Sequence, residues 1–136
     1  MGYHVVKAGE HVFEERPNPT GQEDQIPRLA SDLTTAAALK ESRARLWRYS
    51  PGTRGRRHAD QVQEEVFVVL SGTLTMLLGE PPERVELPPH SVVAVEPKTP
   101  LQLRNDTGDE VLVFIYGAPP IHGEAEFLDD PDPPDD

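Results

Sequence analysis

The chain has 136 residues, enough for one domain with a buried core and too few for two, and it contains no cysteine, which excludes disulfides and thiolate metal ligands. A formal net charge of −11 argues against a nucleic-acid partner, and no apolar run approaches the roughly 20 residues of a membrane span. We therefore expect a cytoplasmic single-domain protein that binds neither nucleic acid nor membrane.

Residues 1–43 are expected to form an N-terminal arm that either packs on the outside of the domain or is exchanged with a second subunit. A short β-prone run at 3–6 precedes a segment at 13–26 that is rich in proline, glycine and charge, as is typical of a long loop. Asp32 stands before an alanine-rich stretch, where its carboxylate is suited to cap one short helical turn.

Residues 44–120 carry short β-strand patterns that recur at regular spacing, separated by turn-forming residues such as Ser71-Gly72 and Pro88-Pro89. We expect strands at 45–50, 65–70, 73–78, 84–87, 91–95, 101–104 and 111–116. Many short strands with regular turns predict an all-β sandwich or barrel.

Residues 121–136 form an acidic, proline-rich tail. Seven of the acidic residues of the chain lie between Glu124 and Asp136. Such a segment has too little apolar surface to offset the entropy of ordering it, so we expect it to be disordered.

A polar motif lies between Gly52 and Gly72. His58 and Asp60 are separated by one residue, so both side chains point to the same face of an extended strand, and Glu65 follows after a turn on the next strand. The order and intervals resemble the first motif of the cupin superfamily, which has a glycine, two histidines, a glutamate and a second glycine. Asp60 stands at the position of the second histidine.

The second cupin motif is matched in part. Pro88-Pro89, a strand, a proline-rich turn and Asn105 fall into place, whereas Leu101 stands where the family has a histidine and His90 where it has a glycine. The resemblance covers residues 44–117. It implies a double-stranded β-helix, the jelly-roll barrel of cupins.

In metal-binding cupins, the histidines and glutamate of the two motifs hold a divalent metal. The resemblance implies that His58, Asp60 and Glu65 are the candidate ligands here for Mn, Fe, Ni or Zn, and Leu101 cannot coordinate a metal. One imidazole and two carboxylates are an oxygen-rich set that suits a hard metal. The alternative, which we prefer, is that these side chains form a hydrogen-bonded polar cluster in the barrel mouth without any cofactor.

A ligand pocket is expected inside the barrel. Trp47 and Tyr49 share a face of their strand and are expected to form one wall. The full expected lining is Trp47, Tyr49, His58, Asp60, Glu65, Phe67, Met76, Leu101 and Leu103. Three further cationic side chains, Arg54, Arg56 and Arg57, either surround the rim and attract an anionic ligand or form a solvated surface.

Three functions are compatible with these patterns. The first is a protein that binds a small organic ligand in the barrel. The second is a metal-dependent enzyme of the isomerase, epimerase or dioxygenase type, in which His58, Asp60 and Glu65 bind the metal and His58 and Glu65 are the candidate catalytic residues. The third is a non-catalytic dimeric scaffold. Exposed sheet edges and the family resemblance predict a homodimer, but the fold alone cannot choose a function.

Overall fold

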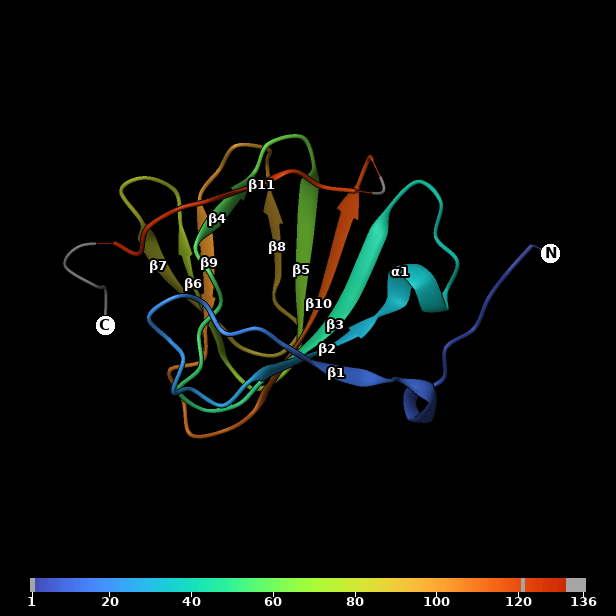
Figure 1. The fold of residues 1–136 in the computed structure, drawn as a ribbon, viewed down its shortest axis with the longest axis horizontal. Coiled ribbons are helices and arrows are strands. Elements are labelled where there is room, and N and C mark those ends of the chain that lie inside the picture. The colour runs from blue at the N-terminus through green and yellow to red at the C-terminus, as the bar shows by residue number, and fades with distance from the viewer. Residues whose placement is uncertain (1, 121, 132–136) are drawn as a thin grey trace.

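The computed structural model describes residues 2–120 and 122–131, and it contains two antiparallel sheets that face each other (Figure 1). The six-stranded sheet has the order β1-β2-β3-β10-β5-β8, and the five-stranded sheet has the order β11-β4-β9-β6-β7. The strands are β1 (Phe13–Arg16), β2 (Arg28–Asp32), β3 (Arg43–Tyr49), β4 (His58–Asp60), β5 (Glu64–Ser71), β6 (Leu74–Leu78), β7 (Glu83–Leu87), β8 (Val92–Val95), β9 (Leu101–Arg104), β10 (Val111–Ala118) and β11 (Ala125–Phe127).

The core lies between the two sheets because alternate residues of each strand point inward. Along β5, Glu65, Phe67 and Val69 are buried while the residues between them are more exposed. The opposite sheet contributes Met76 and Leu101, which are fully buried. The double-stranded β-helix expected from the sequence is therefore confirmed, as are the seven expected strands from β3 onward.

The N-terminal segment contributes more regular structure than its sequence indicates. Part of the expected loop at 13–26 is β1, which pairs with β2, and β2 pairs with β3, so the hairpin extends the six-stranded sheet. Residues 3–6 form no strand. The pairing of β2 with the edge of β3 supplies backbone hydrogen bonds that stabilise this hairpin. Local composition does not predict such pairing because it depends on a distant strand.

Two short helices accompany this segment, η1 (Ala8–Glu10) and α1 (Leu33–Ala36). Asp32 caps α1 as expected, because its Oδ1 accepts hydrogen bonds from the amides of Thr34 at 3.1 Å and Thr35 at 3.4 Å. Within residues 2–120 and 122–131, no helix is long and apolar enough to cross a membrane.

Part of the segment 121–136, expected from its composition to be disordered, is ordered. Strand β11 pairs with β4, and beyond it the Leu128 amide donates to the Arg57 carbonyl at 2.9 Å. Asp130 then forms an ion pair with Arg54 at 3.3 Å. The basic loop before β4 thus binds Asp129 and Asp130, which composition alone assigned to a disordered tail. Residues 121 and 132–136 lie outside the described part of the chain.

Two residues of the second motif have clear structural roles. The Asn105 side chain is buried and donates to the carbonyls of Tyr49 at 2.9 Å and Asp109 at 2.8 Å, so it ties the end of β3 to the turn before β10. His90 adopts a left-handed backbone conformation with φ +77°, at the position where the family pattern has glycine. Its exposed side chain makes no hydrogen bond to another described residue.

The conformation of His90 leads to a test. A left-handed residue other than glycine carries a steric cost of roughly 1–2 kcal/mol, part of which is offset by the extra entropy of glycine in the unfolded chain. We expect His90→Gly to raise the free energy of unfolding by about 0.5–1 kcal/mol in urea titrations. The control is Glu96→Gly, at an exposed loop position without positive φ. This variant is expected to lower the free energy of unfolding. Destabilisation by both variants would contradict strain at His90.

Candidate functional site

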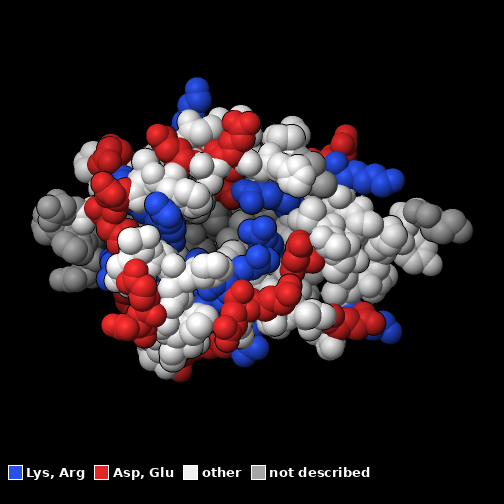
Figure 2. Space-filling view, viewed as in Figure 1, with Lys and Arg blue, Asp and Glu red and all other residues white. Residues whose placement is uncertain are grey.

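A cavity of about 430 Å³ lies inside the barrel. Figure 2 shows one face of the molecule hollowed near its centre, with basic side chains gathered around the hollow. The walls are largely apolar and include Trp47, Tyr49, Phe67, Leu103, Ile115 and Phe127. An apolar cavity with a few convergent charged groups is the usual form of a small-molecule site.

The structure brings together six of the nine residues expected to line a pocket, namely Trp47, Tyr49, His58, Glu65, Phe67 and Leu103. The other three do not line this cavity. Met76 and Leu101 are fully buried in the core, and Asp60 is engaged by the turn that follows β4. Whether the lining residues bind a ligand stays a prediction.

Strand register explains how Arg43 and Glu65 meet. Gly117 on β10 lies opposite Arg43 of β3 on one side and opposite Glu65 of β5 on the other. Across this position, Arg43 Nη2 approaches Glu65 Oε2 to 3.3 Å. The absence of a side chain at Gly117 leaves room for the side chain of Gln63, which a Cβ atom at position 117 would overlap.

Asp60 contacts the same Arg43 side chain and also fixes the turn after β4. Its Oδ1 accepts hydrogen bonds from the amides of Val62 at 3.0 Å and Gln63 at 2.7 Å, which fixes the turn between β4 and β5. Its Oδ2 lies 3.2 Å from Arg43 Nη2. The guanidinium therefore bridges the two carboxylates, and Arg43 Nε also donates to Gln63 Oε1 at 2.6 Å.

These residues do not fit a transition metal. The oxygens of Asp60 are occupied by backbone amides and by Arg43, and Leu101, which lies opposite His58 in the register of β4 and β9, is apolar. Across the part of the chain that the structure describes, no three His, Asp or Glu side chains are grouped so that they could hold a metal ion. Arg43 supplies the positive charge between the acids, and no feature of the cupin motifs marked it.

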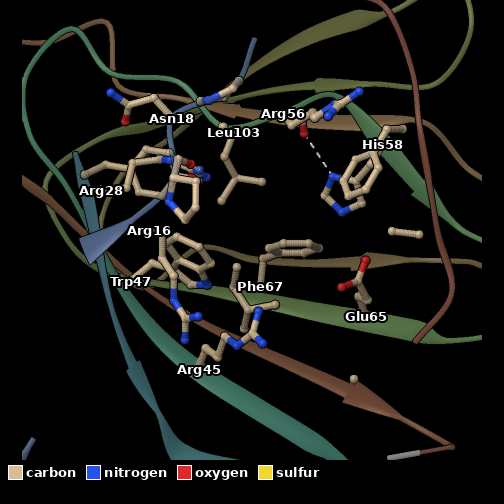
Figure 3. A pocket seen from close by; sticks show the side chains of 18 of the residues that line it. Arg16, Asn18, Arg28, Arg45, Trp47, Arg56, His58, Glu65, Phe67 and Leu103 are labelled. Carbon is tan, nitrogen blue, oxygen red and sulfur yellow. Dashed lines mark hydrogen bonds between the residues drawn. The ribbon is translucent and has the colours of Figure 1, made fainter. Parts of the chain in front are cut away.

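His58 is oriented by the backbone. Its Nδ1 lies 2.9 Å from the carbonyl oxygen of Arg56, and because a carbonyl only accepts, Nδ1 carries the proton (Figure 3). In the neutral ring Nε2 is then an acceptor, without a hydrogen-bond partner among the described residues. The Phe127 ring packs beside the imidazole at 6.4 Å between centroids, so β11 helps to hold it.

Basic side chains dominate the charge of the cavity. Among the described residues, five arginines and one carboxylate, that of Glu65, line the cavity, although the chain as a whole is strongly acidic. The arginines are Arg16, Arg28, Arg43, Arg45 and Arg56. Burial lowers the pKa of Arg45, and the neighbouring cations Arg16 and Arg43 lower it further. The cavity is therefore a cationic compartment in an acidic protein.

The sequence indicated only part of this arginine set. Of the loop residues expected at the rim, Arg56 lines the cavity and lies 4.3 Å from the Phe127 ring centre, whereas Arg54 and Arg57 pair with Asp130 and Glu80. On β3, the two-residue alternation that places Trp47 and Tyr49 on one face also places Arg43 and Arg45 there. Arg16 and Arg28 belong to the hairpin of β1 and β2, which had no recognisable pattern.

Burial raises the pKa of the Glu65 carboxyl, and the nearby Asp60 carboxylate raises it further, while His58 and Arg43 act in the opposite direction. In the folded protein Glu65 consequently holds its proton to a higher pH than in the unfolded chain, where its ordinary value is 4.5. Ionisation of Glu65 thus destabilises the fold as pH rises through the folded-state pKa.

This shift predicts a pH-dependent effect of Glu65→Gln, since glutamine mimics the protonated acid. We expect the variant to gain stability relative to wild type as the pH rises above about 4.5, by at most roughly 1.4 kcal/mol per pH unit. Urea titrations of both proteins at several pH values measure the difference. If the variant instead loses relative stability with rising pH, then the pairing with Arg43 outweighs burial.

The geometry can be compared with that of known proteins. The cupin domain family model matches residues 45–116, and a search of curated proteins found no match. Similar solved structures include a cupin-superfamily sugar phosphate isomerase from Silicibacter pomeroyi, with 20% identity, a TM-score of 0.71 and coverage of 88% of this chain and 76% of that chain. A predicted oxalate decarboxylase from Thermotoga maritima has 15% identity and a TM-score of 0.71, covering 84% of this chain and 97% of its own.

A third similar structure is the polyketide cyclase RemF from Streptomyces resistomycificus, with 16% identity, a TM-score of 0.72 and coverage of 92% and 86%. At these identities the structural likeness establishes the fold and leaves the activity open. The family match spans more than half of the chain, from β3 to β10. The chain therefore belongs to the cupin family.

Proposed function

We propose that this cupin binds a small organic anion inside the barrel cavity. The observation that carries the proposal is the excess of basic side chains in the lining, five arginines against one carboxylate. Arg43 is paired with Asp60 and Glu65, but Arg16 and Arg45 form no ion pair with any other described residue. A bound anion would offset the cost of holding these charges together in a partly buried site.

The distribution of charge supports selective binding of an anion in the cavity. Acidic side chains surround the basic hollow on the face in Figure 2. The overall charge is −11, yet five of the 13 Lys and Arg residues line the cavity, where low-dielectric walls strengthen their field. The aromatic walls add favourable contact for an apolar body, as Trp47 and Phe67 both line the cavity.

The names of similar structures agree with an anionic ligand. One is called a sugar phosphate isomerase and another a predicted oxalate decarboxylase, and both names refer to anionic substrates. They support the chemical class and leave the individual compound open.

A second candidate function is proton transfer on the bound ligand. In the neutral ring of His58, Nε2 is an acceptor without a hydrogen-bond partner among the described residues, and Glu65, whose pKa is raised by burial, lines the same cavity. Groups whose environments shift their pKa values are suited to acid and base roles. This arrangement favours acid-base chemistry over the metal-dependent alternative, for which Asp60 and Leu101 do not supply ligands.

The binding proposal can be tested because Trp47, which lines the cavity, is the only tryptophan of the chain. Benzoate and its neutral isostere benzamide are matched probes. We expect benzoate to change Trp47 fluorescence and to bind about tenfold or more tightly than benzamide, since charge-assisted hydrogen bonds to guanidinium are strong. The benzoate affinity should fall as salt is added. Equal affinity for the two probes, or no binding of either, would refute the proposal.

We also propose that two copies associate through the outer face of the six-stranded sheet. An apolar groove of about 470 Å³ crosses this face and includes Leu46, Val68 and Phe114. Leu70 and Tyr116, also in the groove, are 43% and 37% exposed. Apolar surface of this kind commonly marks a protein interface.

Sedimentation tests the association. Wild type is expected to be a dimer at micromolar concentration, and Leu70→Glu is expected to shift it to monomer because a charge is costly in an apolar interface. Val62→Glu is the matched control, since Val62 is 42% exposed and lies outside the groove. A wild-type monomer would overturn the proposal.

A further inference from the structure

The cavity has two chemically different ends. His58 and Glu65 lie on one side of Phe67, and Arg16, Arg28 and Trp47 lie on the other (Figure 3). The second end is built by the hairpin of β1 and β2 against β3. Its arginines have no role in the cupin motifs.

Arg16 and Arg28 are a like-charged pair fixed by strand register. They lie directly opposite each other in the antiparallel pairing of β1 and β2, so both side chains are on the same face of the sheet. Like charges directly opposite each other destabilise a sheet. No carboxylate forms an ion pair with either side chain among residues 2–120 and 122–131.

The guanidinium of Arg28 is preorganised and incompletely satisfied. Arg28 is only 9% exposed, and its Nη2 donates to the Pro17 carbonyl at 2.7 Å. The guanidinium also lies 5.1 Å from the ring centre of Trp47, which holds it in place. The Nε atoms of both Arg28 and Arg16 are buried without a hydrogen-bond partner in the described structure, which is a costly state for a polar group.

Arg45 adds a third positive charge. It lies opposite Asp32 in the pairing of β2 and β3, but the Asp32 carboxylate accepts hydrogen bonds from the α1 amides and does not form an ion pair with it. The proximity of Arg16 is one reason that the pKa of Arg45 is lowered. Three guanidinium groups from three adjacent strands thus line one end of the cavity, and no acid of the described residues forms an ion pair with them.

We propose that Arg16, Arg28 and Arg45 form a subsite for a dianionic head group of the phosphate monoester type, with the organic body of the ligand reaching toward His58 and Glu65. This inference rests on the proposed binding of an organic anion. A carboxylate offers two oxygens and one charge, whereas a phosphate monoester offers three terminal oxygens and close to two charges at neutral pH. The latter matches three forked cationic donors better.

The test compares phenyl phosphate with benzoate, which share the same aromatic body. We expect phenyl phosphate to bind wild type about tenfold or more tightly. Arg16→Gln and Arg45→Gln should each weaken phenyl phosphate binding by about tenfold or more and leave benzamide binding within about twofold. The matched control is Arg48→Gln, which removes the same charge from the outer face of β3, where Arg48 pairs with Glu110, and should change both affinities by less than about twofold.

A second measurement uses inorganic phosphate, which has no aromatic ring, as the probe. Inorganic phosphate should raise the melting temperature of wild type and of Arg48→Gln but not that of Arg16→Gln or Arg45→Gln, because only a bound anion stabilises the fold. Circular dichroism confirms that each variant is folded.

The outcomes separate this inference from the proposal on which it rests. If benzoate and phenyl phosphate both bind but Arg16→Gln and Arg45→Gln keep wild-type affinity, the subsite is wrong and anion binding in the cavity stands. Equal affinity for phenyl phosphate and benzoate also overturns the subsite. If no probe binds and Trp47 fluorescence is unchanged, then the proposed function itself fails.

Discussion

The polar interior of the barrel depends on the Arg43 guanidinium, which lies between the carboxylates of Asp60 and Glu65 at 3.2 and 3.3 Å. Without this cation, two buried acids would face each other and repel. Arg43 can reach both because strand register places it and Glu65 on either side of Gly117 and because Asp60 is fixed by the turn after β4. The position that carries a second metal-binding histidine in other cupins has thus become part of an ion-paired cluster.

The same strand that supplies Arg43 organises the rest of the cavity. Arg45, Trp47 and Tyr49 follow at two-residue intervals on the inner face of β3, and the hairpin of β1 and β2 pairs with its edge. This hairpin brings Arg28 over the Trp47 ring and Arg16 opposite Arg28. Strand β3 therefore connects the end of the cavity that contains Glu65 with the end where the charged side chains among the described residues are arginines.

A cationic cavity inside an acidic protein is a costly arrangement unless something is gained from it. Folding must bury guanidinium groups beside one another, and the buried Nε atoms of Arg16 and Arg28 have no acceptor in the described structure. Natural proteins concentrate such costs at functional sites. The proposed binding of an anion would provide a physical reason for this cost, and it would account for the arginines and the aromatic walls together.

The sequence by itself determined an all-β sandwich or barrel, seven of the strands between β3 and β10 and six of the cavity-lining residues, because two-residue alternation and turn residues are local properties of the chain. The jelly-roll topology was implied by the resemblance of the motif between Gly52 and Gly72 to that of cupins. Only the tertiary structure revealed Arg43 between the acids, Arg16 and Arg28 in the cavity, and Phe127 beside His58. These contacts join segments far apart in the chain, and their partners are chosen by strand pairing and charge complementarity. The local sequence pattern does not encode such long-range pairing. For this reason the sequence predicted a loop where β1 pairs with β2, and a disordered tail where β11 pairs with β4.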